Sequence, residues 1–432
     1  MNKKITGQIF ISDEALSEIE KKVKNLSDFK KNIESVLQEN ITEVLENILA
    51  GAINLNASDI HIEPRKKETK IRIRIDGILQ EVVSLDKKIF ESILSRIKLL
   101  SALKLNVSDR PQDGRFSIIS KQEIIEIRVS SLPSEYGESI VLRILNPKSL
   151  IEIESLGLRK DLLELFLKEI KKPNGMIIVT GPTGSGKTTT LYAFLKRIKS
   201  PEVKVITIED PIEYHLKGIS QTQVRPEKGY DFANGLRSIM RQDPDAILVG
   251  EIRDLETTKI AIQSALTGHL VLTTLHTNDA AGTIARLINL GAKPANIGPA
   301  VNMIIAQRLV RKICPKCAKL EKAPPSILNK LKRELKGIPK EIKIPKIGDG
   351  LKILKPKGCE DCHNSGYKGR AGIFEAILID DEMENFIFKN PSIAALRKKA
   401  FKKGMTTMKQ DGFLKVLNQE TNIEEIERVA GE

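Results

Sequence analysis

One stretch of eight residues constrains the fold of this chain more than any other. Residues 181–188 read Gly-Pro-Thr-Gly-Ser-Gly-Lys-Thr and satisfy the pattern G-x-x-x-x-G-K-[ST] in full. The apolar residues 176–180 suit a strand and residues 191–195 suit a helix, which is the strand–loop–helix context that a phosphate-binding P-loop requires. The chain is therefore predicted to bind a nucleoside triphosphate.

The residues of this loop have separate expected roles. Its glycines let the backbone curve so that N–H groups at a helix N-terminus point at phosphate oxygens. Lys187 is expected to reach the β- and γ-phosphates, and the Thr188 hydroxyl is expected to bind Mg²⁺. The residues predicted to contact nucleotide here are Gly181, Pro182, Thr183, Gly184, Ser185, Gly186, Lys187, Thr188 and Thr189.

The length of 432 residues is enough for about three domains. We divide the chain into a short helical segment (1–40), a small α+β domain (41–146), an α/β core (150–310), a tetracysteine segment (311–372) and a helical C-terminus (373–432). No window approaches 18 uninterrupted apolar residues, and the basic start at residues 1–7 has no apolar stretch behind it. A cytosolic protein is expected.

The net charge of +14 permits binding to nucleic acid or to anionic lipid. The 70 Lys and Arg residues are expected to be spread widely over solvated surfaces. Trp is absent and aromatic residues make up 4%, so the stacking platforms of single-strand binders are poorly supplied. Nucleic acid is not the partner that composition favours.

The α/β core is predicted from strands that alternate with helices around the P-loop. Further strands are expected at residues 203–208, 246–250 and 270–274, with helices at residues 232–240 and 255–266. This alternation predicts a doubly wound α/β nucleotide-binding fold.

Acidic residues follow two of these strands. Glu209, Asp210 and Glu213 come after residues 203–208, which places their carboxylates at the carboxyl edge of the sheet, where ligands bind in such folds. Glu251 comes after the next strand in a Walker-B-like position, where it is expected to hold Mg²⁺ through water together with Thr188.

Histidines and arginines are the remaining candidates for the nucleotide site. His269 and His276 flank the predicted strand 270–274, where a sensor of the γ-phosphate can sit, although a lone histidine is more often structural. A guanidinium supplied to a γ-phosphate accelerates transfer by roughly 10³–10⁵. The candidate arginines are Arg72, Arg74, Arg128, Arg143, Arg237, Arg241 and Arg253.

The four cysteines form two CxxC pairs, Cys314 with Cys317 and Cys359 with Cys362. Cytosolic thiols stay reduced, so disulfides are the weaker interpretation, and two CxxC pairs suit structural Zn²⁺. His363 completes a formal CxxCH haem-attachment pattern, which we discount because that chemistry requires export.

Together these motifs resemble the secretion ATPase superfamily. The matching boxes are the P-loop, an Asp box at 208–213, a Walker B box at 248–254 and a His box at 267–277, and the resemblance spans about residues 41–430. Within the superfamily the chain resembles the extension ATPases of type IV pilus assembly and type II secretion. These carry a similar tetracysteine subdomain, which retraction ATPases lack.

The resemblance implies a role for each matching residue. Glu213 acts on the attacking water, Glu209 and Asp210 support the metal, and Glu251 is the Walker B glutamate. His269 and His276 are the His box histidines. Arg128 and Arg143 reach the nucleotide from a PAS-like N-terminal domain, while Arg237, Arg241 and Arg253 lie near the phosphates of a RecA-like core or at an adjoining interface.

The resemblance also implies partners. Such ATPases use ATP, Mg²⁺ and Zn²⁺, work as homohexamers on the inner face of the cytoplasmic membrane, and drive an inner-membrane platform protein without contacting pilin directly. Extension ATPases often have a long N-terminal docking domain, whereas about 40 residues precede the match here, so the mode of docking stays open. So do the choice between secretion, pilus and DNA-uptake systems and the alternative of a nucleic-acid motor.

Overall fold

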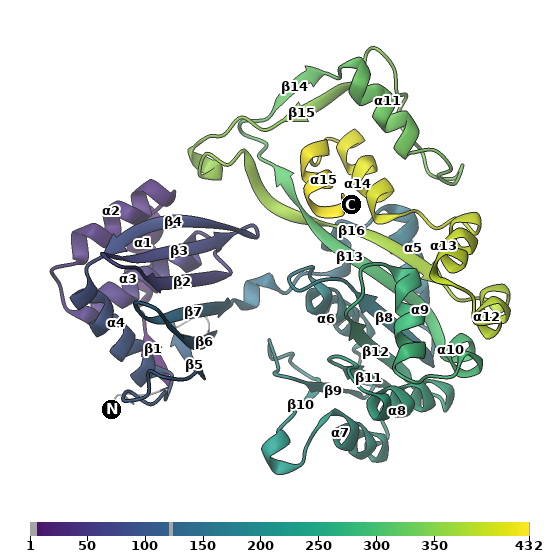
Figure 1. Ribbon diagram of the computed structural model, residues 1–432, viewed down its shortest axis with the longest axis horizontal. Helices are drawn as coiled ribbons and strands as arrows, with labels where there is room; N and C mark the ends of the chain where they lie inside the picture. Colours follow the sequence, from purple (N-terminus) through teal and green to yellow (C-terminus); the bar gives the residue numbers. More distant parts are fainter. Residues whose placement is uncertain (1–6, 121–123, 432) are drawn as a thin grey trace. The chain divides into compact units, whose positions relative to one another are not determined.

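A computed structural model describes residues 7–120 and 124–431 (Figure 1). The chain divides into two compact units. The first comprises residues up to 149 together with 314–317 and 356–368, and the second comprises residues 150–313, 318–355 and 369–432. The boundary at 149/150 falls directly after a short 3₁₀ turn, Pro147–Ser149.

The first unit is built on a seven-stranded sheet of order β1-β5-β6-β7-β2-β3-β4. The β1–β5 pair is parallel, and the neighbouring pairs from β5 to β4 are antiparallel. Alternate residues of β3 are buried, so one face of the sheet is apolar and the other is polar. The strands are β1 (Gln8–Phe10), β2 (Asp59–Pro64), β3 (Thr69–Ile75), β4 (Ile78–Leu85), β5 (Gln112–Ile119), β6 (Ile124–Ser134) and β7 (Gly137–Leu145).

Four helices pack with the apolar face of this sheet: α1 (Asp13–Lys22), α2 (Leu26–Val36), α3 (Ile41–Asn54) and α4 (Lys87–Leu100). Ile9, Phe29 and Ile33 share one hydrophobic cluster with the sheet, so the segment expected to stand apart as residues 1–40 adds a strand and two helices to the first unit. Gly51 lies inside α3. A Cβ there would meet the Phe29 ring at 2.2 Å, so close packing explains this glycine.

The second unit contains a sheet of order β10-β9-β11-β12-β8-β13-β16. All registered pairs from β10 to β13 are parallel. The strands are β8 (Gly175–Thr180), β9 (Val205–Glu209), β10 (Ser220–Gln223), β11 (Ala246–Val249), β12 (Leu270–Leu275), β13 (Val301–Ile313) and β16 (Tyr367–Leu378). The predicted core strands are therefore present, and β10, β13 and β16 extend the sheet.

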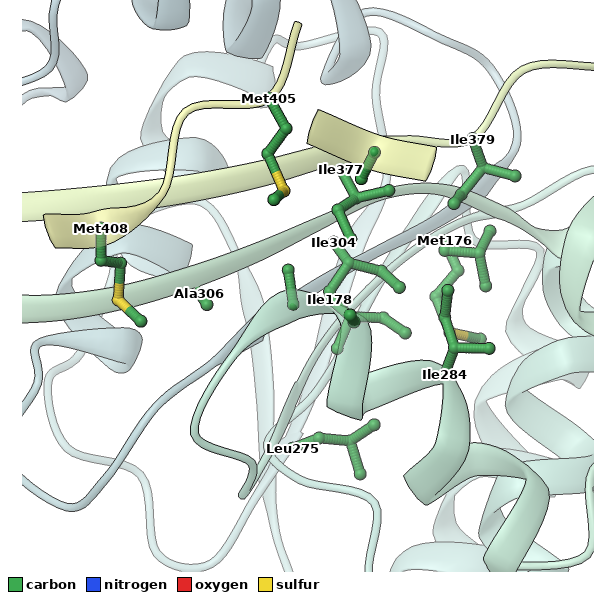
Figure 2. Close-up of a cluster of buried hydrophobic side chains, with 14 of the residues drawn as sticks. Met176, Ile178, Leu275, Ile284, Ile304, Ala306, Ile377, Ile379, Met405 and Met408 are labelled. Carbon is green, nitrogen blue, oxygen red and sulfur yellow. The ribbon is translucent and has the colours of Figure 1, made fainter. Parts of the chain in front are cut away.

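Both faces of the core sheet are buried, as parallel sheets require. Met176 and Ile178 of β8 face one hydrophobic cluster, which Figure 2 shows in part, whereas Ile177 and Val179 face a second one. The first cluster includes α7 (Phe232–Ile239), α8 (Leu255–Leu266), α9 (Ala280–Asn289) and α10 (Pro294–Ala300), and the second includes α5 (Lys160–Glu169) and α6 (Lys187–Ile198). The result is an α/β fold with helices on both sides of the sheet.

The rest of the second unit is helical apart from a two-stranded ribbon. The ribbon pairs β14 (Lys319–Lys322) with β15 (Lys352–Lys355), and α11 (Pro325–Glu334) lies between them in sequence. The C-terminal helices are α12 (Asp381–Phe388), α13 (Ile393–Lys402), α14 (Met408–Leu417) and α15 (Ile423–Ala430). Across residues 7–120 and 124–431, none of the helices has both the length and the apolar character needed to cross a bilayer.

Candidate nucleotide site and metal centre

The P-loop joins the carboxyl end of β8 to the amino end of α6. Gly181, Gly184 and Gly186 all adopt positive φ angles, of 146°, 79° and 86°, which side chains disfavour. Lys187 donates hydrogen bonds from its Nζ to the carbonyl oxygens of Gly181 at 2.9 Å and Pro182 at 3.1 Å, so its ammonium group lies over the loop. The Ser185 hydroxyl is buried and has no hydrogen-bond partner among the described residues. A concave backbone with a lysine over it fits a phosphate chain.

Gln307 of β13 supports this loop, and the sequence analysis missed it. Its Nε2 donates to the Ser185 carbonyl at 2.7 Å, and its Oε1 accepts from the Thr190 hydroxyl at 2.7 Å. A Cβ on Gly181 would lie 2.4 Å from the Gln307 carbonyl oxygen, so the loop fits closely against the strand. The signal available in the sequence was a polar amide placed directly after the apolar run 303–306.

Two carboxylates that follow neighbouring strands affect the pKa of Lys187. Burial lowers the pKa of Lys187, while the charges of Glu251 and Glu213 act in the opposite direction. Glu251 has a side chain only 15% exposed, and it is paired with Arg253 and with His276 Nε2, at 3.4 Å. Burial and the Lys187 charge lower the pKa of His276. Glu213, Glu251, Arg253, His276 and Lys187 therefore occupy one edge of the core sheet.

Glu209 belongs to a different, buried environment beneath that edge. Its Oε1 accepts hydrogen bonds from the Thr207 hydroxyl at 2.6 Å and from Gln221 Nε2 at 3.2 Å, and its Oε2 accepts one from the Tyr192 hydroxyl of α6. Burial raises the pKa of Glu209. The carboxylate thus has both oxygens engaged with protein donors, whereas Asp210 beside it is exposed.

The Glu209 network extends to the loop that carries Glu213. Gln221 donates to the Tyr214 carbonyl at 3.0 Å and accepts from the Leu216 N–H at 2.7 Å. The rings of Tyr192 and Tyr214 meet edge to face, with centroids 6.1 Å apart. The P-loop helix is therefore connected through Glu209 and Gln221 to residues 214–216, which directly follow Glu213.

The two histidines lie at opposite edges of the sheet. His276 follows Leu275, which pairs with Thr180 at the P-loop end of β8, and the Thr180 hydroxyl accepts from the Thr277 N–H at 2.9 Å. His269 precedes β12 and lies next to the carbonyl of Ser264 at the end of α8, with Nδ1 at 3.1 Å. A six-residue strand separates them by about 20 Å. Within this chain, His269 is not brought to the phosphate edge.

Arg237 and Arg241 lie on an exposed surface at α7. Arg237 pairs with Glu256 and donates to Asn234 Oδ1 at 3.0 Å. Arg241 donates to the Arg237 carbonyl at 3.2 Å and to the Ser238 hydroxyl at 3.3 Å. Their exposed positions suit an interface better than the phosphate edge.

Four arginines of the first unit form a row with Asp59 across five strands. Arg115, Arg128, Arg143, Asp59 and Arg74 are consecutive register partners on β5, β6, β7, β2 and β3, so they share the polar face of the sheet. The buried Asp59 carboxylate pairs with Arg143 Nε at 3.0 Å and Arg74 Nε at 3.3 Å. Asp59 was not among the predicted site residues.

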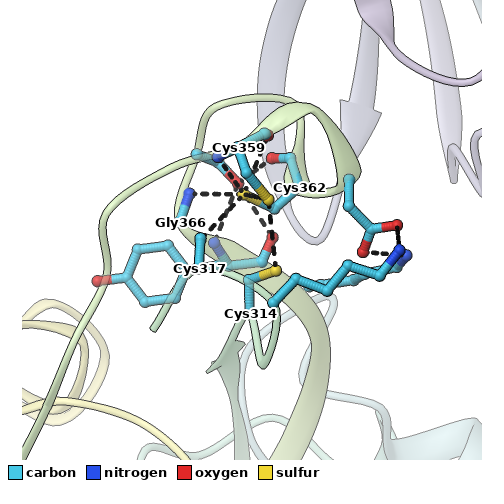
Figure 3. Close-up of polar contacts among 10 residues, drawn as sticks. Cys314, Cys317, Cys359, Cys362 and Gly366 are labelled. Atoms are coloured by element: carbon cyan, nitrogen blue, oxygen red, sulfur yellow. Dashed lines mark hydrogen bonds and ion pairs between the residues drawn. The ribbon is translucent and has the colours of Figure 1, made fainter. Parts of the chain in front are cut away.

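The four cysteines form a compact cluster (Figure 3). Sγ–Sγ distances are 3.9 Å for Cys314 and Cys359, 3.8 Å for Cys317 and Cys362, and 3.7 Å for Cys359 and Cys362. Tetrahedral bonds of about 2.3 Å would place sulfurs about 3.8 Å apart. Against the effect of burial, the backbone N–H groups of Cys359 and Gly366 lower the pKa of Cys362 to about 7, whereas burial raises that of Cys314 to about 11. The geometry fits one metal ion.

The core fold and its phosphate edge together define a P-loop protein of the α/β class. A family model described as Type II/IV secretion system protein matches residues 34–428. The chain therefore belongs to the type II/IV secretion system protein family, as the sequence motifs predicted.

Individual relatives agree with this assignment. The chain is 44% identical over 393 residues to Type II secretion system protein E of Dickeya dadantii, covering 91% of this chain and 76% of that protein. It is 42% identical over 391 residues to the type IV pilus assembly ATPase PilB of Pseudomonas aeruginosa, covering 90% and 67%. For PilB of Thermus thermophilus the identity is 43% over 383 residues, with 88% of this chain but 42% of the relative covered.

Solved structures support the fold. The pilus retraction motor PilT with bound ADP matches with a TM-score of 0.59 and 26% identity, covering 88% of this chain and 95% of that one. The ATPase DotB of Legionella pneumophila matches with a TM-score of 0.65 at 21% identity, covering 89% and 94%. These likenesses extend over both units of the chain.

Proposed function

We propose that this chain hydrolyses ATP as the motor subunit of a pilus-assembly or type II secretion machine. The observation that carries the proposal is the convergence of Lys187, Glu213 and Glu251 at the edge of a P-loop sheet. The names of its relatives, secretion proteins and pilus assembly ATPases, support the same reaction. The second unit would act as a RecA-like core and the first as a PAS-like domain.

Each residue of the edge has a proposed part in hydrolysis. The P-loop backbone and Lys187 bind the phosphates, and Glu213 orients the attacking water. Thr188 and Glu251 offer the oxygen ligands that Mg²⁺ prefers, and the ion would supply positive charge against the phosphate oxygens. His276 and Arg253 contact the Glu251 carboxylate. They would therefore orient this ligand without binding the ion themselves.

The role that we propose for Glu209 differs from the metal support that the resemblance implied. Because Tyr192, Thr207 and Gln221 already engage its oxygens, it positions the Glu213 loop. His269 would likewise act structurally, at the junction of α8 and β12.

Other parts of the proposal concern assembly. We infer a homohexamer in which Arg128 and Arg143 supply positive charge to a nucleotide, and in which the exposed Arg237 and Arg241 face a neighbouring subunit. The motor would act at the cytoplasmic face of the inner membrane on a platform protein, without direct contact to pilin. The competing function, a nucleic-acid motor, gains no support from the 4% aromatic content.

The test separates nucleotide binding from hydrolysis. Lys187→Ala removes the charge that binds the phosphates, so ATP binding and turnover should both be lost. Glu213→Gln keeps the shape but not the charge, so ATP should bind normally while turnover falls by about 10²–10⁴. Near-normal turnover in Glu213→Gln would move the catalytic role to another carboxylate. DNA-stimulated turnover with steep salt dependence would favour the nucleic-acid motor.

A further inference from the structure

A carboxylate interrupts the apolar part of β16, and the nucleotide site described above makes no use of it. Residues 371–379 read Ala-Gly-Ile-Phe-Glu-Ala-Ile-Leu-Ile, with Glu375 at the centre. Ile373 and Ile377 lie on the same face of the strand as Glu375, and both belong to the hydrophobic cluster that includes α9 and α14 (Figure 2). Glu375 is only 4% exposed. Because a buried charge is costly unless hydrogen bonds stabilise it, the partners of this carboxylate indicate its role.

Glu375 contacts the first residues of two helices. Its Oε1 accepts a hydrogen bond from the N–H of Ala280, the first residue of α9, at 3.1 Å. The N–H of Met408, the first residue of α14, also acts on this carboxylate as a hydrogen-bond donor. Burial raises the pKa of Glu375 and the nearby Asp279 acts in the same direction, whereas the two N–H groups oppose them. The N-terminal end of a helix carries partial positive charge, so both helices favour a negative charge at this position.

The start of α9 continues directly from the segment that carries His276. Asp279 caps this helix, because its Oδ1 accepts a hydrogen bond from the Gly282 N–H at 2.7 Å. The Asp279 carbonyl accepts one from the Thr277 hydroxyl at 3.1 Å. Thr277 Oγ1 also lies 2.7 Å from the hydroxyl oxygen of Thr180, the residue before the P-loop. The segment is therefore held between the P-loop strand and the start of α9.

A shift of the α9 start would move His276 relative to Glu251. His276 Nε2 lies 3.4 Å from Glu251 Oε2, which is already long for a hydrogen bond, so a small displacement would break the contact. Arg397 of α13 also pairs with Asp279 at 2.7 Å, but its side chain is exposed and such ion pairs contribute little. The buried hydrogen bond to Glu375 is therefore the stronger constraint on this end of α9.

The strand that carries Glu375 is itself fixed. The N–H of Phe374 donates a hydrogen bond to Asp411 Oδ2 of α14 at 2.8 Å. Asp411 is fully buried and also pairs with Arg159. The residue before Glu375 is thus bonded to a packed helix, and the carboxylate is presented to α9 from a strand with little freedom to move.

We propose that Glu375 is a positioning residue of the nucleotide site, which fixes the start of α9 and so keeps His276 in contact with Glu251. It acts from β16, outside the P-loop and the three boxes of acidic and histidine residues. The inference rests on the proposed function for the role of Glu251 as a ligand of Mg²⁺. The contacts from Glu375 to the His276 segment do not require turnover, so the two can be tested apart.

The first measurement is hydrogen exchange of the full chain without nucleotide, followed by mass spectrometry over residues 276–283. Glu375→Ala removes the acceptor, and exchange in this segment should be about tenfold faster than in the wild type. Glu375→Gln keeps one acceptor oxygen without the charge, so its exchange should be intermediate. The control is Glu425→Gln, which changes a buried carboxylate of α15 that pairs with Arg311 and Arg428. It should leave exchange in this segment unchanged.

The second measurement is the binding of a fluorescent ATP analogue in Mg²⁺ or in EDTA. Residues that orient a metal ligand contribute roughly 10–100-fold to metal affinity, so the gain in affinity that Mg²⁺ provides should fall about tenfold in Glu375→Ala. Binding in EDTA should stay near that of the wild type, because the P-loop and Lys187 are unchanged. His276→Gln should show the same loss, and the double variant should be no worse than either single variant, since both remove one contact.

Several outcomes would overturn the inference. Unchanged exchange of residues 276–283, in whichever Glu375 variant folds, would show that the carboxylate does not hold this segment. Equal weakening of nucleotide binding in Mg²⁺ and in EDTA would indicate a general loss of structure, as would equal effects in Glu425→Gln. Additive losses in the double variant would separate Glu375 from His276. If exchange and Mg²⁺-dependent binding change as expected but the wild type does not hydrolyse ATP, the positioning role stands and the proposed function fails.

Discussion

The hydroxyl of Tyr192, in the helix that follows the P-loop, donates a hydrogen bond to the Glu209 carboxylate at the end of the next strand. Tyr192 is fully buried, and burial with the nearby Glu209 charge raises the pKa of its hydroxyl, so it stays a donor. Through Gln221, Glu209 is joined to the backbone of Tyr214 and Leu216, directly after Glu213. The nucleotide-binding helix and the proposed water-orienting residue are thus mechanically connected.

Tyr192→Phe should therefore lower kcat while leaving the KM for ATP and the Mg²⁺ requirement unchanged. A hydrogen bond to a charged group is worth about 1.5–3 kcal/mol. If part of this free energy holds Glu213 in its catalytic position, its loss lowers kcat about tenfold. Glu209→Gln should behave alike, and the double variant should be no worse than either alone, because both remove the same connection.

The matched control is Tyr230→Phe, which removes a hydroxyl bonded to Thr222 at 3.0 Å, next to Gln221 but outside the network. Its kcat should stay near that of the wild type. If Glu209→Gln instead raised the Mg²⁺ concentration needed for turnover while Tyr192→Phe had no effect, Glu209 would be a metal-supporting residue.

Asp59 is expected to position Arg143 for the reaction. Asp59→Asn weakens the charged contact to Arg143 Nε, and the guanidinium gains freedom to leave the row. We expect kcat to fall about tenfold, less than in Arg143→Ala, with nucleotide affinity nearly unchanged. Arg72→Ala is the control, because Arg72 lies on the same strand as Arg74 but pairs with Glu63. Wild-type kcat in Asp59→Asn would rule this positioning role out.

The cysteine cluster should hold one structural Zn²⁺ per chain. Four thiolates close the coordination shell and leave no position for a catalytic water, so the ion would stabilise residues 314–317 and 356–368. Elemental analysis should give a stoichiometry near one, and the thiols should resist modification until a chelator is added. Cys362→Ser should lose the metal yet still bind ATP at the P-loop. Four freely titratable thiols in metal-free protein would contradict the assignment.

Glu425 should make stability depend on pH at the acid end. Although burial opposes it, hydrogen bonds from Arg428 and Arg311 lower the pKa of Glu425 from 4.5 to about 2. A depressed carboxyl pKa stabilises the fold above the unfolded value, and this contribution is lost as pH falls from about 4.5 towards 2; it amounts to about 3 kcal/mol at most. In urea unfolding, Glu425→Gln should cost stability at pH 7 but little near pH 2. Glu424→Gln, an exposed neighbour, should cost little at either pH.

The local parts of the site could be predicted because they are contiguous in sequence. The P-loop, its flanking strand and helix, and α8 over residues 255–266 lie where the pattern placed them. A glycine-rich turn needs particular backbone angles, and a buried strand needs an apolar run, so both leave a signal within a few residues. The cluster of four cysteines was predictable for a similar reason, since two CxxC pairs leave a signal within a few residues.

What the sequence by itself determined was therefore the class of fold, the phosphate loop, the family and the metal-type ligands. Tertiary structure decided which residues lie at the same edge of the core sheet. His269 and His276 are seven residues apart, yet a strand places them at opposite edges, and Gln307 reaches the P-loop from over a hundred residues away because β13 pairs with β8. Whether Glu209 faced a metal or Tyr192 likewise depended on side-chain burial. Such relations follow from strand order and packing between distant segments, and neither has a local signature in the chain.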